Sequence, residues 1–463
     1  MKIDLVYPSS TCGSENYSSE APLGPVALYT SLPLIYRENT RFLDSTVLIQ
    51  EEIEKELINR KADIVAISCT TYNYPNALRV AEIAKNNGSF VVMGGIHITH
   101  LRDVILNKMQ KGERPIDFLV TGYGEPAFEP LLKAIESGKG FFEIPNLSFI
   151  NNGEIVINHQ INPRFGNDPL IFPMDYSEID FNLYSEKFHP FGNLSDAKVP
   201  GSIFTQRGCT YSGSKKCSFC SIEKINVHRT IDLFEQDLTN LISHYNVDQI
   251  RITDADFTVN KHHMSQIADA AERVYDKTGI RPVVHCFARA DEIDEQRITH
   301  LKKLNVVSLF IGYESGSNKM LHSMQKGMTK DQNLQATKLL KKHGIDVICG
   351  GLVLGAEGEN EDTLQETLLF VKELTKIGNT VSLVATPLIP LPGSLCFNEL
   401  LKKLRNLNLV KYQELLNSDI FSIEELIELW NKYFCNVPLK RIIQVCKDIE
   451  NLIPAGIKLI SLY

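Results

Sequence analysis

Three cysteines lie close together in the sequence, at Cys209, Cys217 and Cys220. Seven residues separate the first two, and two residues separate the second pair. Cysteine thiolates are soft ligands that suit zinc and iron–sulfur clusters. A closed zinc site takes four protein ligands, and the nearest further candidate is His228. Three thiolates would leave one metal position open for a substrate, whereas a degenerate zinc knuckle or a chance cluster is the alternative interpretation.

The composition is that of an ordinary globular protein, because 43% of the 463 residues are hydrophobic and 22% are charged. The net charge of −8 disfavours a broad nucleic-acid interface, which needs a basic face. The first residues read as a strand rather than a signal peptide, and we see no run of about 18 apolar residues that could span a membrane. Ten cysteines then indicate reduced thiols in a reducing compartment. We therefore expect a cytoplasmic protein without nucleic-acid or membrane partners.

Short apolar runs alternate with amphipathic stretches over residues 1–150, which predicts an α/β domain with a parallel, doubly wound sheet. The predicted strands are Ile3–Tyr7, Asp63–Ser68, Phe90–Met93 and Phe118–Thr121. In such sheets ligands bind beyond the carboxyl ends of the strands. Small, polar or glycine-rich loops follow three of these strands, at residues 68–71, 94–97 and 121–125. Each loop alone would be explained as a tight turn, but three at successive strand ends favour one shared ligand.

These loops, with Pro22-Leu23-Gly24, Gly94-Gly95-Ile96-His97 and Gly122-Tyr123-Gly124-Glu125, resemble the cobalamin-binding domain found in front of many radical S-adenosylmethionine enzymes. The resemblance implies a Rossmann-like domain whose cobalamin contacts are Ser68, Thr70, Gly94, Gly95, Gly122, Tyr123 and Glu125. The Asp-x-His-x-x-Gly motif, whose histidine replaces the lower cobalt ligand in many cobalamin proteins, is absent. We interpret His97 and His100 as loop or helix-start residues rather than cobalt ligands.

Three further segments follow the first domain. Residues 151–199 contain many turn signals and are predicted to be a linker, with a small hairpin near residues 147–158. Residues 200–395 return to strand–helix alternation with six predicted strands, which fits a partial (β/α)6 barrel. Residues 396–463 form a C-terminal helical region by their apolar spacing. Barrel active sites lie at the carboxyl ends of the strands, where the cysteine loop is predicted to be.

Other polar or glycine-rich motifs follow the remaining barrel strands. They are Thr253-Asp254-Ala255-Asp256, Gly312-Tyr313-Glu314-Ser315 and Gly350-Gly351-Leu352-Val353-Leu354-Gly355. Carboxylates there can accept hydrogen bonds from an ammonium or ribose hydroxyls, and glycines let a planar ring lie against the backbone. Helix capping is the alternative for Asp254 and Asp256, and an ion pair is the alternative for Glu314. Arg289, Asp291, Tyr313 and Cys286 are candidate pocket residues.

In this order the motifs resemble the radical S-adenosylmethionine (SAM) superfamily. The resemblance implies that Cys209, Cys217 and Cys220 hold a [4Fe–4S] cluster whose fourth iron binds SAM. It also implies SAM contacts from Phe219, Asp254, Asp256, Glu314, Gly351, Val353 and Gly355. The implied reaction is reductive cleavage of SAM to a deoxyadenosyl radical, with an electron donor such as flavodoxin or ferredoxin. The family spacing between the first two cysteines is three residues, and we hypothesise that the extra residues here loop out as a polar turn.

The resemblance implies methylation of an unactivated carbon, or of phosphorus, in a small molecule or peptide, with cobalamin as methyl donor. Cyclisation, rearrangement or another alkyl transfer is the second interpretation, and a radical SAM enzyme with a vestigial cobalamin domain is the third. A non-catalytic iron–sulfur or zinc scaffold is the most distant alternative, because it leaves the strand-end motifs unexplained. No catalytic side chain is identified from the sequence.

Overall fold

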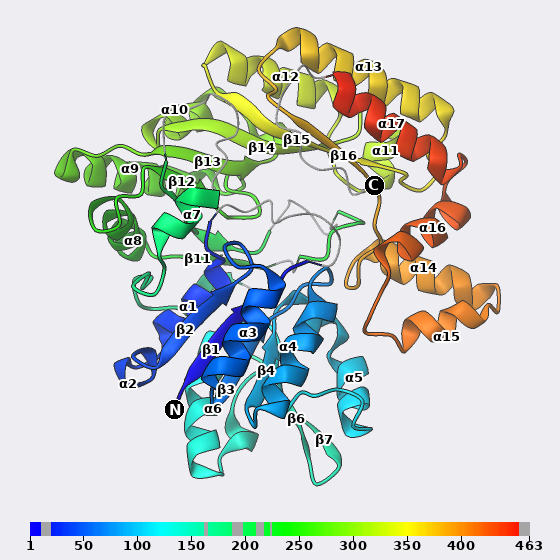
Figure 1. The fold of residues 1–463 in the computed structure, drawn as a ribbon. Coiled ribbons are helices and arrows are strands. Elements are labelled where there is room, and N and C mark those ends of the chain that lie inside the picture. Colours follow the sequence, from blue (N-terminus) through cyan, green and yellow to red (C-terminus); the bar gives the residue numbers. More distant parts are fainter. Residues whose placement is uncertain (11–19, 162–164, 188–197, 210–216, 223–224, 453–463) are drawn as a thin grey trace. The chain divides into compact units, whose positions relative to one another are not determined.

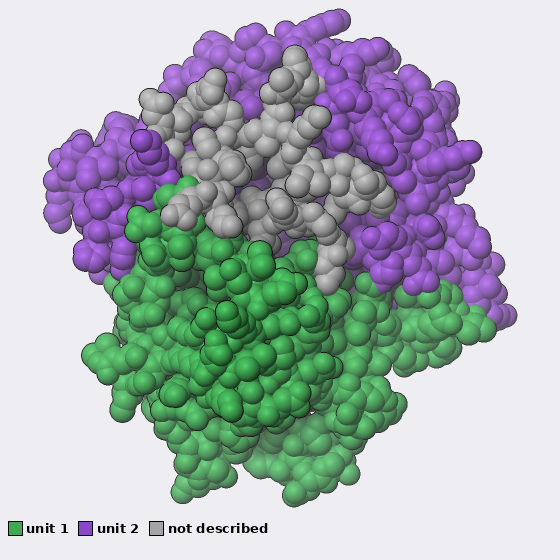
Figure 2. Space-filling view, viewed as in Figure 1, with its two compact units in different colours: residues 1–164, 168–187, 410–421 green, residues 165–167, 188–409, 422–463 purple. Residues whose placement is uncertain are grey.

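The computed structural model describes residues 1–10, 20–161, 165–187, 198–209, 217–222 and 225–452. Residues 210–216 of the cysteine loop, where a polar turn is predicted, therefore lie outside the described residues. The chain divides into two compact units, coloured separately in Figure 2. Unit 1 comprises residues 1–164, 168–187 and 410–421, and unit 2 comprises residues 165–167, 188–409 and 422–463. Among the described helices, none combines the length and apolar character of a membrane span.

Unit 1 is built on a seven-stranded sheet in the order β2-β1-β3-β4-β5-β6-β7 (Figure 1). Its strands are β1 (Ile3–Tyr7), β2 (Thr40–Asp44), β3 (Ile64–Ser68), β4 (Phe90–Gly94), β5 (Phe118–Val120), β6 (Leu147–Asn151) and β7 (Glu154–Ile157). The first five are parallel to one another, whereas β6 is antiparallel to both β5 and β7. The doubly wound prediction is confirmed, and the predicted hairpin extends the same sheet.

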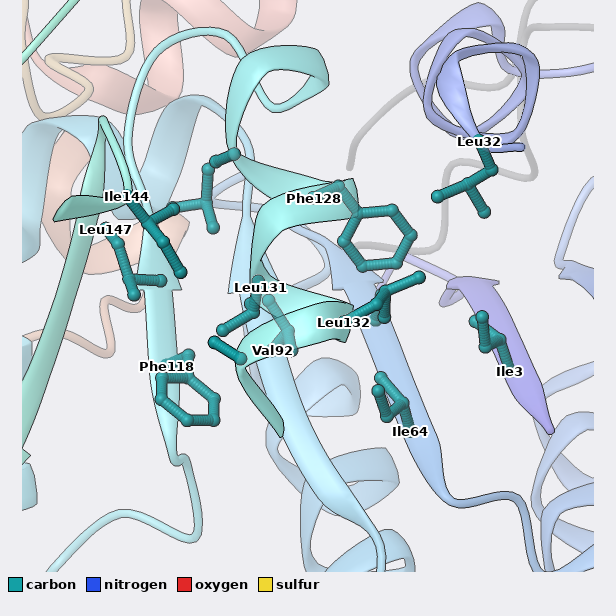
Figure 3. Packing of buried hydrophobic residues seen from close by; sticks show 14 of the residues in the cluster. Ile3, Leu32, Ile64, Val92, Phe118, Phe128, Leu131, Leu132, Ile144 and Leu147 are labelled. Atoms are coloured by element: carbon teal, nitrogen blue, oxygen red, sulfur yellow. The ribbon is translucent and has the colours of Figure 1, made fainter. Parts of the chain in front are cut away.

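The described part of unit 1 contains six α-helices among the strands of its sheet and two more from later in the chain. They are α1 (Leu23–Ser31), α2 (Leu34–Arg37), α3 (Gln50–Arg60), α4 (Tyr74–Asn86), α5 (Ile96–Gln110), α6 (Glu125–Ser137), α7 (Phe181–Lys187) and α15 (Val410–Leu416). Figure 3 shows α6 packing Phe128, Leu131 and Leu132 into the hydrophobic core of the sheet. Burying one such side chain stabilises the fold by about 1.5–3 kcal/mol.

Unit 2 contains a six-stranded parallel sheet in the order β16-β15-β14-β13-β12-β9, which confirms the partial barrel. Its strands are β9 (Pro200–Ile203), β12 (Gln249–Ile252), β13 (Val283–Ala288), β14 (Val306–Glu314), β15 (Asp346–Leu354) and β16 (Leu383–Pro387). A second sheet, in the order β10-β11-β8, joins β8 (Phe165–Asn167), β10 (Gln206–Arg207) and β11 (Asn226–His228). This small sheet was not predicted, because its strands are too short to show alternation.

The helices of unit 2 complete the βα units and the C-terminal helical region. They are α8 (Ile231–Ser243), α9 (Lys261–Thr278), α10 (Glu295–Lys303), α11 (Asn318–Ser323), α12 (Lys330–Lys342), α13 (Glu361–Ile377), α14 (Leu395–Asn406), α16 (Ile423–Phe434) and α17 (Leu439–Leu452). Local chemistry sets several of these ends. Asn260 caps α9 by accepting from the His263 N–H at 3.1 Å, and Gly378 ends α13 with φ +78°.

Candidate functional site

One face of the unit 2 sheet carries the side chains that are only partly buried. Cβ atoms alternate between the two faces of a strand, and paired residues of parallel strands share a face. Gly351 pairs with Gly312, and a Cβ on Gly351 would meet no atom closer than 3.9 Å. A Cβ on the adjacent Gly350 would lie 2.5 Å from Leu383 Cδ2 and 2.7 Å from Tyr313 Cε2. The Gly351 side is therefore the open face, and the Gly350 side packs against the protein.

Aromatic and cationic side chains line this open face. Phe287 and Phe310 are adjacent in register and stack with ring centroids 4.7 Å apart. The Arg251 guanidinium lies 5.1 Å from the Phe310 ring centre, which is within the range of a cation–π contact. Next along β13 and β14, the ring of His285 contacts the Ser308 hydroxyl at 2.6 Å. The face thus offers a stacked aromatic pair beside one positive charge.

Two of the predicted pocket residues do not lie on this face. Tyr313 is fully buried and its hydroxyl contacts the Thr337 hydroxyl at 2.7 Å, while Cys286 is also fully buried. Side chains alternate between the two faces along a strand, so Cys286 points to the opposite face from Phe287, and Tyr313 to the opposite face from Phe310. The interpretation of Tyr313 and Cys286 as pocket residues is therefore wrong. Strand parity was the signal in the sequence that would have placed Phe287 and Phe310 there instead.

The Cys217–Cys220 turn is held by backbone hydrogen bonds. Ser218 N–H donates to Met324 O, Cys396 N–H donates to Ser218 O, and Cys220 N–H donates to Cys217 O, at 2.9, 2.9 and 3.1 Å. Burial raises the pKa of the Cys217 thiol, and the charges of Lys326 and Arg289 oppose that rise. Within the described residues, no three His, Cys, Asp or Glu side chains are grouped to hold a metal ion. The ligand set Cys209, Cys217 and Cys220 stays a prediction, as does the role of the partly buried Phe219.

Glu314 ends β14 in a strained conformation. Its φ of +60° lies in the left-handed region, which is uncommon for residues other than glycine and clusters at functional sites. The carboxylate lies over Gly312, where a Cβ would come within 2.3 Å of Glu314 Oε1, and it accepts from Lys326 Nζ at 2.7 Å. Burial lowers the pKa of Lys326, but the Glu314 carboxylate raises it above its ordinary value. The ion pair considered as the alternative for Glu314 is therefore present.

The Asp254 side chain binds the backbone just before the cysteine loop. Its carboxylate accepts from the Thr205 N–H at 2.7 Å, the Thr205 hydroxyl at 2.5 Å and the Gln206 N–H at 3.1 Å. The side chain is fully buried. Burial raises the pKa of Asp254 to about 7, although these hydrogen bonds lower it. Asp254 is not a helix cap, and its direct contact with SAM stays a prediction.

Asp256 forms a second acidic group with Glu292. The Thr258 hydroxyl lies between them, at 3.0 Å from Asp256 Oδ1 and 2.8 Å from Glu292 Oε2. Asp256 Oδ2 is buried and accepts from no N–H or hydroxyl group among the described residues, and the neighbouring Glu292 carboxyl is a hydrogen-bond partner of the Asp256 side chain. Burial, and then the Asp256 charge, raise the pKa of Glu292 to about 8. Arg289, which directly follows β13, pairs with Asp291 at 3.1 Å and donates to Lys326 O at 2.7 Å.

Glu359 and Trp430, for which the sequence indicated no role at the site, hold Gly355 at the end of β15. Gly355 has φ +89°, its N–H donates to Glu359 Oε2 at 2.9 Å, and its carbonyl accepts from Trp430 Nε1 at 2.8 Å. Glu359 is fully buried, and burial raises its pKa. Trp430 also stacks on Phe434 at 4.1 Å. Gly351 and Val353 remain partly exposed, whereas Gly355 is buried, so the three predicted SAM contacts differ in accessibility.

In unit 1 the three predicted loops meet at one sheet edge, because β3, β4 and β5 are adjacent and parallel. The Cys69 N–H donates to Gly94 O at 2.8 Å. Gly95 has φ +102°, and a Cβ there would lie 2.4 Å from Cys69 O, so this close approach requires glycine. Ser68, Thr70, Gly94, Gly95 and Glu125 are partly exposed, Gly122 is exposed and Tyr123 is buried.

His97 is the second residue of α5, which agrees with its interpretation as a helix-start residue. Its Nε2 lies 3.0 Å from a main-chain carbonyl and must donate, so Nδ1 accepts from the Thr71 hydroxyl at 3.2 Å. Burial lowers the pKa of His97 to about 4. Both ring nitrogens are therefore engaged within the protein, which leaves no lone pair for a cobalt ion.

Comparison with known proteins identifies both units. Residues 203–371 match the radical SAM superfamily, and residues 22–132 match the B12 binding domain. The chain is a radical SAM protein with a B12-binding domain. An uncharacterized methyltransferase of Pyrococcus horikoshii is 28% identical over 84% of this chain and 81% of the relative. The anaerobic magnesium-protoporphyrin IX monomethyl ester cyclase of Cereibacter sphaeroides is 26% identical over 79% of this chain and 59% of the relative.

The fold of this radical SAM protein is similar to that of a solved relative. The radical SAM methyltransferase TsrM from Kitasatospora setae, with cobalamin and a [4Fe–4S] cluster, has a TM-score of 0.67. The match is 16% identical and covers 87% of this chain and 75% of TsrM. The radical SAM domain takes a [4Fe–4S] cluster and SAM, and the B12-binding domain takes cobalamin.

The residues present fit these groups. Thiols are the donors of iron–sulfur clusters, and burial raises the pKa of the Cys217 thiol while the charges of Lys326 and Arg289 partly offset that rise. At the edge of unit 1, the hydroxyl residues Ser68 and Thr70 and the glycines at 94, 95 and 122 are partly or fully exposed, so hydroxyl and main-chain groups are accessible there. Lys326, Glu292 and Glu359 were missed by sequence reasoning. The Gly-Glu pair at residues 358–359 was a visible signal for the last of these, whereas Lys326 follows a loop without periodicity.

Proposed function

We propose that this chain is a cobalamin-dependent radical SAM methyltransferase that methylates a carbon, or phosphorus, of a small organic molecule or peptide. The observation that carries the proposal is the presence of both cofactor domains in one chain. When bound, the cluster supplies the electron that cleaves SAM, and cobalamin supplies the methyl group. The relative named as a methyltransferase, which matches over most of both chains, supports this choice.

The protein's own residues would bind and orient these groups. We assign the cluster to Cys209, Cys217 and Cys220, and the methionine ammonium to Asp256, whose buried Oδ2 accepts from no N–H or hydroxyl group among the described residues. Asp254 acts on the cysteine loop through Thr205 and Gln206, so it is a positioning residue. Glu314 would face the ribose, held by Lys326. Gly351 and Val353 would lie against adenine, with Phe219 beside it and Gly355 setting the end of the strand.

Unit 1 would bind cobalamin at its loop edge through Ser68, Thr70, Gly94, Gly95, Gly122, Tyr123 and Glu125. Because His97 is neutral and doubly hydrogen-bonded, we propose that the protein binds cobalamin without a histidine ligand from this loop. An electron donor such as flavodoxin or ferredoxin would reduce the cluster.

A second candidate is radical cyclisation or rearrangement. The relative from Cereibacter sphaeroides is named as a cyclase and matches over 79% of this chain. Both candidates require the cluster, SAM and the cobalamin domain, so they differ only in the fate of the substrate.

The test is anaerobic reconstitution with iron and sulfide, followed by addition of cobalamin, SAM and a reductant. We expect cluster absorbance in the visible range, deoxyadenosine formation and retained cobalamin. Replacing Cys209, Cys217 and Cys220 together with serine should abolish SAM cleavage, whereas Cys446→Ser, in α17, is the matched control. Zinc without a cluster would exclude a radical enzyme. SAM cleavage without retained cobalamin would leave a radical enzyme with a vestigial first domain.

A further inference from the structure

A short segment from late in the chain is part of the B12-binding unit. Residues 410–421 belong to unit 1, although the residues on both sides of them belong to unit 2. The segment contains α15 and ends shortly after Asp419. It lies outside residues 22–132, which match the B12-binding domain. Its position in unit 1 therefore has to be explained by its contacts.

Asp419 makes several of these contacts. Its side chain is 1% exposed and pairs with Arg114 through two hydrogen bonds, from Nε at 2.6 Å and Nη2 at 2.7 Å. Oδ2 also accepts from the Tyr74 hydroxyl at 2.9 Å. A two-pronged arginine–carboxylate pair combines charge with fixed geometry, so it holds both partners in one orientation.

The backbone of the same residue contacts a third side chain. His97 Nε2 donates to Asp419 O at 3.0 Å, and the His97 ring lies 4.2 Å from the Tyr74 ring. His97 Nδ1 accepts from the hydroxyl of Thr71. One buried residue thus connects the start of α4, at Tyr74, with the start of α5, at His97.

The two helix starts follow directly from the loops that we assign to cobalamin. Thr70 and Thr71 precede α4, and Gly94 and Gly95 precede α5. The close approach of Gly95 to Cys69 allows little independent movement of the two loops. Fixing Tyr74 and His97 to one carboxylate and one carbonyl would then fix both loops relative to each other.

We infer that Asp419 is a positioning residue for cobalamin, and that it clasps the β3–α4 and β4–α5 loops in the conformation that binds the corrin ring. This rests on the cobalamin binding proposed above. Arg114 is the hydrogen-bonded cation of the clasp, and Lys108 Nζ lies further away, 3.8 Å from Asp419 Oδ1. Tyr74 and His97 are the side chains that the clasp holds, and cobalamin itself does not touch Asp419.

The test compares Asp419→Asn and Tyr74→Phe with the wild-type chain. Tyr74→Phe removes only the hydroxyl and keeps the buried ring, so it remains informative if Asp419→Asn does not fold. Glu414→Gln is the matched control, because this exposed residue lies on the same segment and pairs only with Lys411 in the described contacts. The two readouts are hydroxocobalamin affinity, from spectroscopic titration, and hydrogen exchange of residues 68–74 and 94–100 in the cobalamin-free protein.

We expect the dissociation constant to rise about threefold to thirtyfold in the two clasp variants, with faster exchange in both loops and no change in Glu414→Gln. Unchanged affinity and exchange in the variants would overturn the clasp. Weaker binding without faster loop exchange would overturn its action through the loops, and faster exchange with unchanged affinity would overturn the link to cobalamin. A wild-type protein that binds no cobalamin would overturn the proposed function itself, and with it the ligand named here.

Discussion

Adjacent glycines on β15 should separate folding from SAM binding when each is changed to alanine. In Gly350→Ala the new methyl carbon would lie 2.5 Å from Leu383 Cδ2 and 2.7 Å from Tyr313 Cε2. Overpacking of this kind costs about 1–3 kcal/mol of stability. In Gly351→Ala the nearest atom would be 3.9 Å away, so the stability should change by no more than about 0.5 kcal/mol.

SAM affinity should respond in the opposite way, with the larger loss in Gly351→Ala. If adenine lies against the open face, the Gly351→Ala methyl group occupies its place, and we expect at least about a tenfold loss of SAM affinity, or 1.4 kcal/mol. Gly350→Ala points away from that face, and its folded fraction should retain most of the affinity.

Urea unfolding of the cofactor-free protein measures the stability change, and anaerobic equilibrium dialysis of SAM with the reconstituted protein measures the affinity. Normal SAM binding by Gly351→Ala would show that adenine does not lie on this strand. Equal stability of the two variants would show that the two faces have been assigned incorrectly, which would refute the parity reasoning for Phe287 and Phe310 as well.

Three further changes test the groups around the sheet. The pKa of Glu292 in the folded protein, about 8, lies above its ordinary value of 4.5, so its contribution to stability is fully present below pH 4.5 and is lost as the pH rises from there to about 8. Glu292→Gln should match the wild-type melting temperature at pH 4 and exceed it increasingly up to pH 8.5; parallel profiles would refute the shift. Asp237→Asn removes the carboxylate that lies 2.9 Å from the fully buried Arg229 guanidinium and should cost about 3–5 kcal/mol in urea unfolding. Most of this should return in the double variant with Arg229→Met, and no recovery would contradict the pairing. Trp430→Phe loses the 2.8 Å hydrogen bond to Gly355 O and should cost about 1–3 kcal/mol, measured in the same way; a neutral effect would show that the indole N–H is dispensable.

The regular parts of the fold could be predicted because their strands are rich in valine and isoleucine. The strand at Ile3–Tyr7 has this character and was predicted with its observed bounds, and the strand predicted at Phe90–Met93 extends one residue further, to Gly94. Thr40–Asp44 was missed, since Thr40, Arg41 and Asp44 interrupt the apolar pattern. Its carboxyl end nevertheless contributes Asp44, which accepts from the Tyr184 hydroxyl at 2.5 Å.

The roles of the acidic residues could not be predicted, because partners distant in the sequence decide them. Asp254 and Asp256 are two residues apart and look equivalent in the sequence. In the structure Asp254 binds the backbone about 50 residues earlier, whereas Asp256 faces Glu292, 36 residues later. A strand-end motif therefore shows that polar groups gather at the sheet edge, but the hydrogen-bond network determines which of them is left to bind a ligand.

Residues outside the matched domains contact the candidate site of each unit. In unit 1 the Asp419 carbonyl accepts from His97 Nε2, and in unit 2 Trp430 Nε1 donates to Gly355 O, with Asn436 N–H donating to Glu359 O at 2.8 Å. Both braces come from residues 410–436, beyond residues 22–132 and 203–371 that match the family models. Only two residues separate Asp419 from Ser422, where the chain returns to unit 2. The two family matches therefore do not include the residues that brace either candidate site, and only contacts between residues distant in the sequence reveal them.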